Sequence, residues 1–185
     1  MKKKAIIYLG GGLSQKLAIK SIRKENINII LIDRNLNCAS KIYADIFLNL
    51  DLKDSKKIIQ NLNLLKSKFN FISTYGVADY AMTSVAKINQ KFKINGLNLK
   101  FAKLFTNKEN SKKIFRESKI YTPRTIFYGK EITSIIIRKI FNQKENSKIT
   151  IKSIDQNNGR GVSTIKNFSK NKLINASKIA FKYSK

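Results

Sequence analysis

The sequence predicts an α/β protein with a parallel sheet covered by helices, followed by a second, smaller lobe. Apolar runs of strand length alternate with amphipathic segments of helix length through residue 97, which is typical of a doubly wound sheet. Further along, the stretch 148–165 places two short β-type runs on either side of a polar loop that contains glycine. This pattern predicts a separate hairpin.

The first βαβ unit starts with Ala5–Leu9, a continuous apolar run that is typical of a buried parallel strand. Gly10–Gly12 turns the chain, and Ser14 is the expected N-cap of the next helix. Asn28–Ile32 is the second buried strand and ends at Asp33. The residues spaced for the inward face of the helix are Leu13, Leu17, Ala18 and Ile22.

A dinucleotide-binding fingerprint is only partly present in this unit. Asp33 follows the glycines by about 20 residues, as the fingerprint requires. Its third glycine is missing, because Gln15 occupies that place. Three glycines alone are weak support for NAD binding.

Two further strand–helix pairs follow. The expected strands are Ile46–Leu50 and Phe69–Tyr75, and the expected helices are Ser55–Ser67, capped by Asp54, and Ala78–Gln90. Ligands of such sheets bind at the carboxyl ends of the strands. The candidate substrate-binding residues at this edge are Gly11, Gly12, Asp33, Tyr75 and Gly76. A plain strand end followed by a helix cap explains Tyr75 and Gly76 equally well.

Helices and one more strand are expected around the hairpin. The helices are Asn98–Phe105, Lys108–Lys119, Glu131–Asn142 and Ser169–Tyr183, and the strand is Thr125–Tyr128. The expected inward residues of the last two helices are Ile132, Ile135, Ile136, Ile140, Leu173, Ala176, Ile179 and Ala180. Lys108 is expected to point into a cleft, and Lys112, Lys113 and Arg116 to lie on a solvated face.

The hairpin loop has the composition of a phosphate-binding turn. Lys152 ends the first strand, and the loop Asp155–Gly161 contains Gly159, Arg160 and Gly161. Glycine permits positive φ and close approach of a ligand, and successive backbone N–H groups can form an anion nest. An ordinary hairpin with a flexible tip and a surface lysine has the same composition.

Lys152–Val162 resembles the glycine-rich lid of ATP-grasp enzymes, in which a strand ending in Lys-Pro leads into a loop closed by Gly-Val. Asn107–Phe115 resembles the Asp-Lys helix of this family, and Pro123 stands where its chain enters the lid. Ser153 replaces the usual proline, and Asn107 replaces the usual aspartate. The resemblance covers essentially the whole chain.

The resemblance implies a Rossmann-like pre-ATP-grasp domain over residues 1–97, a helical linker over 98–122 and an incomplete, truncated ATP-grasp small lobe over 123–185. It implies ATP and Mg²⁺ as cofactors, with the metal ligands outside this chain. The implied function is the ATP-binding portion of a carboxylate–amine or carboxylate–thiol ligase that acts through an acylphosphate. The resemblance implies that this chain lacks the C-terminal catalytic lobe, and a second chain that carries this lobe is one partner considered. The implied cofactor-binding residues are Lys108, Lys152, Gly159, Arg160 and Gly161.

Composition limits the alternatives. The net charge of +27 suggests nucleic-acid binding, but the positive residues are dispersed and lysine dominates, as an AT-rich genome would produce. Zinc binding is not expected with no His and only Cys38. No apolar run approaches the ~18 residues of a membrane span, and none fits a signal peptide, so a cytoplasmic location is expected. The alternative function is a non-catalytic module that binds a nucleotide or another small metabolite.

Overall fold

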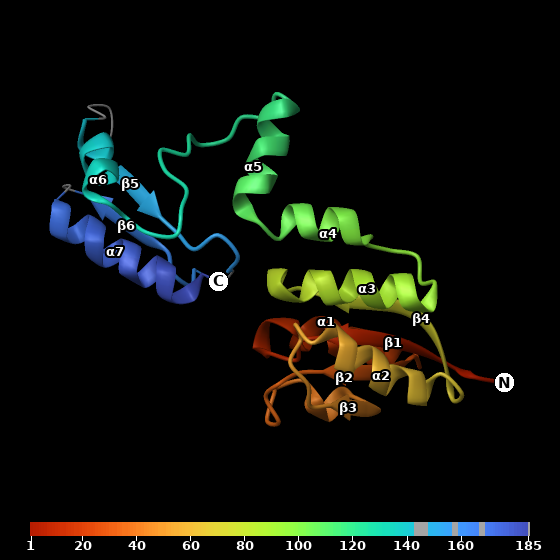
Figure 1. The fold of residues 1–185 in the computed structure, drawn as a ribbon. Coiled ribbons are helices and arrows are strands. Elements are labelled where there is room, and N and C mark those ends of the chain that lie inside the picture. The colour runs from red at the N-terminus through yellow and green to blue at the C-terminus, as the bar shows by residue number, and fades with distance from the viewer. Residues whose placement is uncertain (143–147, 157–158, 167–168, 185) are drawn as a thin grey trace. The chain divides into compact units, whose positions relative to one another are not determined.

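The computed structural model describes residues 1–142, 148–156, 159–166 and 169–184 (Figure 1). The chain forms two compact units, Met1–Thr106 and Asn107–Lys185, and each is described by itself. In the described residues no helix is both long enough and apolar enough to cross a membrane.

The first unit is built on a four-stranded sheet with the order β3-β2-β1-β4. The strands are β1 (Lys3–Leu9), β2 (Asn28–Ile32), β3 (Ile46–Leu48) and β4 (Phe69–Gly76). Every pairing is parallel, which confirms the predicted parallel sheet. Leu9 pairs with both Ile32 and Gly76, so three strands end at the same edge of the sheet.

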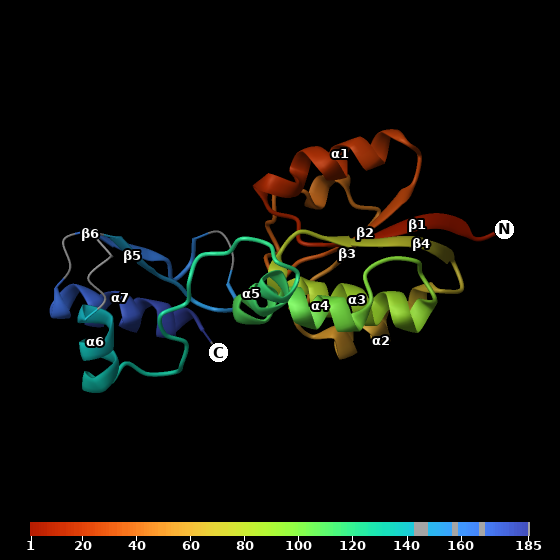
Figure 2. The same ribbon diagram turned by 90° about the horizontal axis from the view of Figure 1, so that it is seen from above.

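Helices cover both faces of this sheet (Figure 2). On one face lies α1 (Lys16–Lys24), and on the other lie α2 (Ser55–Leu65) and α3 (Met82–Phe92), with α4 (Leu99–Phe105) packed against α3. Short 3₁₀ turns span Leu13–Gln15, Lys41–Tyr43 and Asp79–Ala81. The larger core lies between the sheet and α2 and α3, where alternate β1 residues such as Ile7 and Leu9 are fully buried. The other core is formed by Tyr8, Ile19, Ile29, Leu31 and Cys38.

The prediction for the first helix was wrong in its start and in its inward face. A 3₁₀ turn precedes α1, so the α-helix starts at Lys16, and the N-cap is Gln15 with no side-chain cap. Leu13 and Leu17 are 80% and 79% exposed, whereas Ile19 is fully buried. The tighter 3₁₀ turn changes the rotation of the chain per residue, so the apolar face shifts relative to a continuous α-helix.

The second unit contains a hairpin and three helices. Strands β5 (Lys148–Ile151) and β6 (Ser163–Lys166) pair antiparallel, with Ile149 opposite Ile165. The helices are α5 (Lys108–Glu117), α6 (Ser134–Phe141) and α7 (Lys170–Tyr183). The core of this unit is formed by Ile137, Ile140, Ile165, Leu173 and Ala176.

Three predictions for this unit were wrong. Thr125–Tyr128 is not a strand, because it pairs with neither β5 nor β6 and a strand needs a paired neighbour. The predicted helix at 131–142 starts late, at Ser134, because the Thr133 side chain caps it by accepting from the Ile136 N–H. Ile135 and Ile179 are exposed rather than inward-facing.

Candidate functional site

The N-terminus of α5 is formed by a side-chain cap. Asn107 Oδ1 accepts hydrogen bonds from the backbone N–H groups of Glu109 and Asn110, both at 3.0 Å. Asparagine therefore performs the capping role of the aspartate that the family resemblance would place here. The helix then sets Lys108 and Lys112 one turn apart on neighbouring surface positions.

Lys108 is hydrogen-bonded to the hairpin loop. Its backbone N–H donates to the Ile154 carbonyl oxygen at 3.1 Å. Its Nζ donates to the same oxygen at 3.3 Å and to the Gln156 carbonyl oxygen. Lys108 thus contacts the loop by both main chain and side chain, and its contact with nucleotide phosphates stays a prediction.

Ser153 closes the other side of the loop. Its backbone N–H donates to the Gly161 carbonyl oxygen at 3.2 Å, and its Oγ donates to the Arg160 carbonyl oxygen at 2.6 Å. Ser153 is almost fully buried. A proline here would lack both donors, so the departure from the family pattern provides a specific cross-link of the loop.

The glycines make the last turn of the loop. The Val162 N–H donates to the Gly159 carbonyl oxygen at 3.1 Å, and the φ angles of Gly159 and Gly161 are +73° and +69°. A Cβ on Gly161 would lie 3.0 Å from Ser153 Oγ and 3.3 Å from Ala180 Cα, whereas a Cβ on Gly159 would meet nothing within 4 Å. The predicted loop Asp155–Gly161 also includes residues 157 and 158, which lie outside the described residues.

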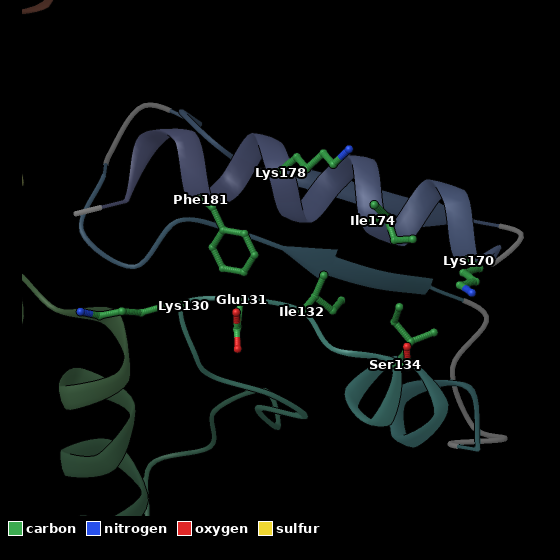
Figure 3. Close-up of a pocket in the computed structure, with 9 residues that line it drawn as sticks. Lys130, Glu131, Ile132, Ser134, Lys170, Ile174, Lys178 and Phe181 are labelled. Carbon is green, nitrogen blue, oxygen red and sulfur yellow. The ribbon is translucent and has the colours of Figure 1, made fainter.

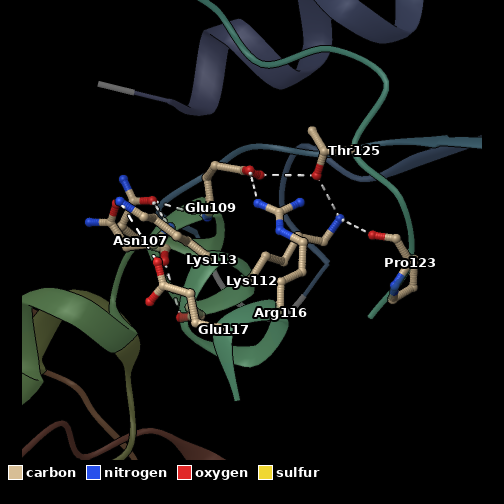
Figure 4. A network of polar contacts seen from close by, with 10 residues as sticks. Asn107, Glu109, Lys112, Lys113, Arg116, Glu117, Pro123 and Thr125 are labelled. Carbon is tan, nitrogen blue, oxygen red and sulfur yellow. Dashed lines mark hydrogen bonds and ion pairs between the residues drawn. The ribbon is translucent and has the colours of Figure 1, made fainter. Parts of the chain in front are cut away.

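Lys152 follows β5 and is exposed, with no hydrogen bond or ion pair to any residue that the structure describes. Lys112 is partly buried, and its Nζ donates to the Pro123 carbonyl oxygen at 2.8 Å and to Thr125 Oγ1 at 2.9 Å (Figure 4). Burial lowers the pKa of Lys112, and the nearby charge of Lys152 lowers it further. The prediction that Lys112 lies on a solvated face was therefore wrong, because the segment after α5 folds back over it.

Glu109 completes this polar network. Its Oε1 accepts from Arg116 Nη2 at 2.8 Å, and its Oε2 accepts from Thr125 Oγ1 at 3.0 Å. Burial acts to raise the pKa of Glu109, but the hydrogen bonds from Arg116 and Thr125 and the positive charges of Arg116 and Lys112 outweigh it. The net result is a lowered pKa. Glu109 is therefore ionised, with both carboxylate oxygens in use.

Sequence reasoning missed Lys112, Thr125 and Ser153 as parts of this region. The spacing of Lys108 and Lys112 by four residues was an available signal, because residues so spaced lie on one side of a helix. Lys113, by contrast, is 73% exposed and lies 4.0 Å from Glu117. It is the solvated lysine that the sequence predicted.

The candidate substrate residues lie at the carboxyl edge of the sheet in the first unit. The Gly11 N–H donates to Asp33 Oδ2 at 2.7 Å, and the Asn35 N–H donates to Asp33 Oδ1 at 2.8 Å. A Cβ on Gly11 would lie 2.7 Å from Cys38 Sγ, so this position requires glycine. Asp33 thus uses both carboxylate oxygens to hold the glycine turn and its own loop.

Tyr75 and Gly76 end β4 at the same edge. The Tyr75 ring is half exposed and lies 5.1 Å from the Tyr8 ring, centroid to centroid. Gly76 packs closely, because an added Cβ would lie 3.1 Å from Val85 Cγ2, and one on Gly12 would lie 2.9 Å from Gln15 Oε1. Strand register brings these glycines, Asp33 and Tyr75 to one edge, and their contact with a substrate stays a prediction.

A cavity of about 370 Å³ opens between α7 and the segment that leads into α6 (Figure 3). In Figure 3, Ile174 and Phe181 point from α7 toward the segment that carries Glu131 and Ile132. The remaining lining residues are Lys130, Ser134, Ile137, Lys170 and Lys178. No predicted site residue lines this cavity.

Within the described residues, no three His, Cys, Asp or Glu side chains are grouped so that they could hold a metal ion. The cationic groups and the glycine turn of the second unit suit a phosphate anion instead.

No protein-family model matches the sequence, and no curated protein matches it. Solved structures do match it. An N5-carboxyaminoimidazole synthetase from Staphylococcus aureus complexed with ADP is 17% identical, with a TM-score of 0.66. The match covers 100% of this chain and 46% of that one.

Two other solved structures, a second N5-carboxyaminoimidazole synthase and an amino acid ligase, also match this chain. The N5-carboxyaminoimidazole synthase from Aspergillus clavatus, in complex with ADP and 5-aminoimidazole ribonucleotide, is 18% identical, with a TM-score of 0.70 over 99% of this chain and 45% of that one. The L-amino acid ligase from Bacillus licheniformis is 13% identical, with a TM-score of 0.67 over 96% and 42%. These three solved structures are ATP-grasp enzymes, so this chain shares the fold of part of an ATP-grasp enzyme, as the sequence resemblance implied, and it spans less than half of their length.

Proposed function

We propose that the second unit binds the phosphate groups of ATP with Lys108, Lys152 and the turn Gly159–Gly161. The observation that carries this proposal is Lys152, an exposed ammonium beside the loop that has no partner among the described residues. The carbonyl oxygens of Ile154, Gln156, Arg160 and Gly161 are all engaged within the unit. Carbonyl oxygens that already accept hydrogen bonds repel a bound anion less. The backbone N–H groups of the same loop can then act as donors to the anion.

We further propose that the chain serves a carboxylate–amine or carboxylate–thiol ligase that acts through an acylphosphate. Phosphoryl transfer depends mainly on positioning and on stabilisation of charge, and lysines and a glycine turn supply both. Two of the three matched structures named above contain ADP, which supports a nucleotide at this fold. The candidate substrate residues of the first unit are Gly11, Gly12, Asp33, Tyr75 and Gly76.

Mg²⁺ enters the proposal only as the ion that accompanies ATP. The described carboxylates form no cluster that fits it, and Glu109 is fully engaged by Arg116 and Thr125. No step of the proposed chemistry is therefore assigned to a metal held by these residues.

The test compares two lysine variants by calorimetric titration of ATP into the 185-residue chain. A charge-assisted contact contributes about 1.5–3 kcal/mol, so Lys152→Ala should weaken ATP binding by roughly tenfold to more than a hundredfold. Lys113→Ala is the matched control, because Lys113 is mostly exposed and pairs only loosely with Glu117. Equal losses for both variants, abolished by moderate salt, would show bulk charge attraction and reject the proposal.

Ligase activity is tested separately, by ADP formation with Mg²⁺ and a panel of carboxylates and amines. ADP formation that depends on Lys152 would support the ligase. ATP binding that depends on Lys152, without ADP formation under any of these conditions, would favour a nucleotide-binding module without catalysis.

A further inference from the structure

Lys112 is held in place by two oxygen atoms of the segment that follows α5. Its Nζ lies 2.8 Å from the Pro123 carbonyl oxygen and 2.9 Å from Thr125 Oγ1. An ammonium group has three N–H donors, and these contacts use two. The third has no acceptor among the residues that the structure describes.

Lys112 and Lys152 come from distant parts of the sequence, yet they lie in the same region of the second unit. Lys108, one turn before Lys112 on α5, donates its backbone N–H to the carbonyl oxygen of Ile154, two residues after Lys152, at 3.1 Å. The positive charge of Lys152 acts to lower the pKa of Lys112. Lys112 is in the second turn of α5, and Lys152 follows β5. Among the described carboxylates, the one that acts on Lys112 is Glu109, which is already engaged by Arg116 and Thr125. Lys112, Lys152 and Arg116 carry three positive charges against one negative charge on Glu109, which leaves a surplus of two.

We propose that Lys112 and Lys152 together bind one phosphate group, with the unused N–H of Lys112 as a donor. An anion between the two ammonium groups removes their mutual repulsion and adds two charge-assisted contacts. The identification of that phosphate as part of a nucleotide rests on the proposed function, whereas the pairing of the two lysines does not.

The surrounding contacts prepare Lys112 for this role. The Pro123 carbonyl and the Thr125 hydroxyl fix its ammonium before any ligand arrives, so less side-chain freedom is lost on binding. Glu109 holds Thr125, and Arg116 holds Glu109. Thr125 and Glu109 are thus positioning residues, which act on the anion through Lys112.

The experiment uses sodium tripolyphosphate, which carries no base or sugar, and ATP as separate probes of the 185-residue chain. Lys112→Gln keeps a donor for Pro123 but removes the charge, and Lys112→Arg keeps the charge. Lys113→Ala is the control on the same helix. We expect Lys112→Gln to weaken tripolyphosphate binding about tenfold or more, and Lys112→Arg and Lys113→Ala to have much smaller effects.

Two further measurements separate binding from a purely structural role. The double variant Lys112→Gln/Lys152→Ala should lose less than the product of the two single losses, because either change breaks the shared site. On tripolyphosphate binding, the lowered pKa of Lys112 should rise, as measured by NMR of its Cε. A residue that only supported the segment Pro123–Thr125 would show neither effect.

The outcomes for the two proposals are distinct. The lysine pair is overturned if the wild-type chain does not bind tripolyphosphate, or if Lys112→Gln binds it as Lys113→Ala does. ATP binding no tighter than tripolyphosphate, with the same dependence on Lys112, would reject the nucleotide function and leave the phosphate site in place.

Discussion

Gly11 and Asp33 are joined across the carboxyl edge of the sheet by a hydrogen bond of 2.7 Å from the glycine N–H to Asp33 Oδ2. The other carboxylate oxygen accepts the Asn35 N–H. In a dinucleotide-binding fingerprint an acidic residue at this spacing meets the ribose. Here the carboxylate instead ties the end of β2 to the turn after β1, so its first role is structural.

Asp33→Asn should therefore destabilise the first unit even without ligand. One side-chain oxygen becomes an NH₂ group that faces a backbone N–H, which leaves a partly buried donor unsatisfied. We expect a loss of about 1–3 kcal/mol in the free energy of unfolding, measured with urea. Asp51→Asn is the control, because Asp51 accepts a single local bond from the Lys53 N–H on an exposed turn. Equal stability of the two variants would contradict the structural role of Asp33.

Gly161→Ala should cost more stability than Gly159→Ala, although both glycines have positive φ. Each substitution places a Cβ in the left-handed region, at about 1–2 kcal/mol. Only the Cβ at Gly161 also crowds Ser153 and Ala180. Thermal unfolding of the two variants measures the difference. An equal loss would show that Ser153 and α7 can move aside without cost.

The strands could be predicted from sequence because buried parallel strands are continuous apolar runs, as Asn28–Ile32 shows. The N-cap of α2 could also be predicted from sequence, since Asp54 does cap this helix by accepting a hydrogen bond from the Lys57 N–H. Which residues of α1 face the core could not be predicted, because hydropathy does not reveal the 3₁₀ turn that precedes this helix. The sequence thus indicates where helices and strands lie better than it indicates which face of a helix is buried.

The hairpin with Lys152 and its glycine turn was also predictable, because both lie within one short stretch. The position of Lys112 was not. Periodicity classes it as one polar residue among several on α5, and its partners Pro123 and Thr125 lie in irregular backbone with no pattern of its own. Contacts between a helix and a distant irregular segment leave no periodic signal.

Glu109 should make the stability of the second unit depend on pH in the acid range. Its folded pKa lies below the ordinary value of 4.5, so its stabilising contribution is present above that value and is lost as the pH falls through the folded pKa. Glu109→Gln should therefore be less stable than the wild type near pH 7, and the difference should vanish under more acidic conditions. Urea unfolding at a series of pH values tests this. A difference that stays constant with pH would reject an ionic role.

Tyr8→Phe should leave stability near neutral pH unchanged within about 1 kcal/mol, or raise it. The Tyr8 hydroxyl is buried without a hydrogen-bond partner among the described residues, so its removal relieves a desolvated polar group. Burial, and secondly Tyr75, raise the pKa of Tyr8 to about 12 from 10.0.

The raised pKa gives the same variant a second signature. The contribution of a protonated Tyr8 is fully present below pH 10.0 and is lost as the pH rises through about 12. The wild type should therefore lose stability relative to Tyr8→Phe across this range. Parallel behaviour of the two proteins from pH 9 upward would show that Tyr8 ionises as readily in the folded chain as in the unfolded one.

The sheet order also has a consequence for biosynthesis. β1 is an inner strand, and its second neighbour β4 starts at residue 69, long after β1 ends at residue 9. At about 5–20 residues per second, a ribosome needs roughly 3–12 s to make the intervening chain. During that interval β2 can already pair with one edge of β1. The other edge of β1 keeps unpaired backbone N–H and C=O groups, next to apolar side chains that are buried in the folded protein. The nascent chain is therefore most exposed to misassociation just before β4 emerges, and chaperone contact should concentrate on this window of translation.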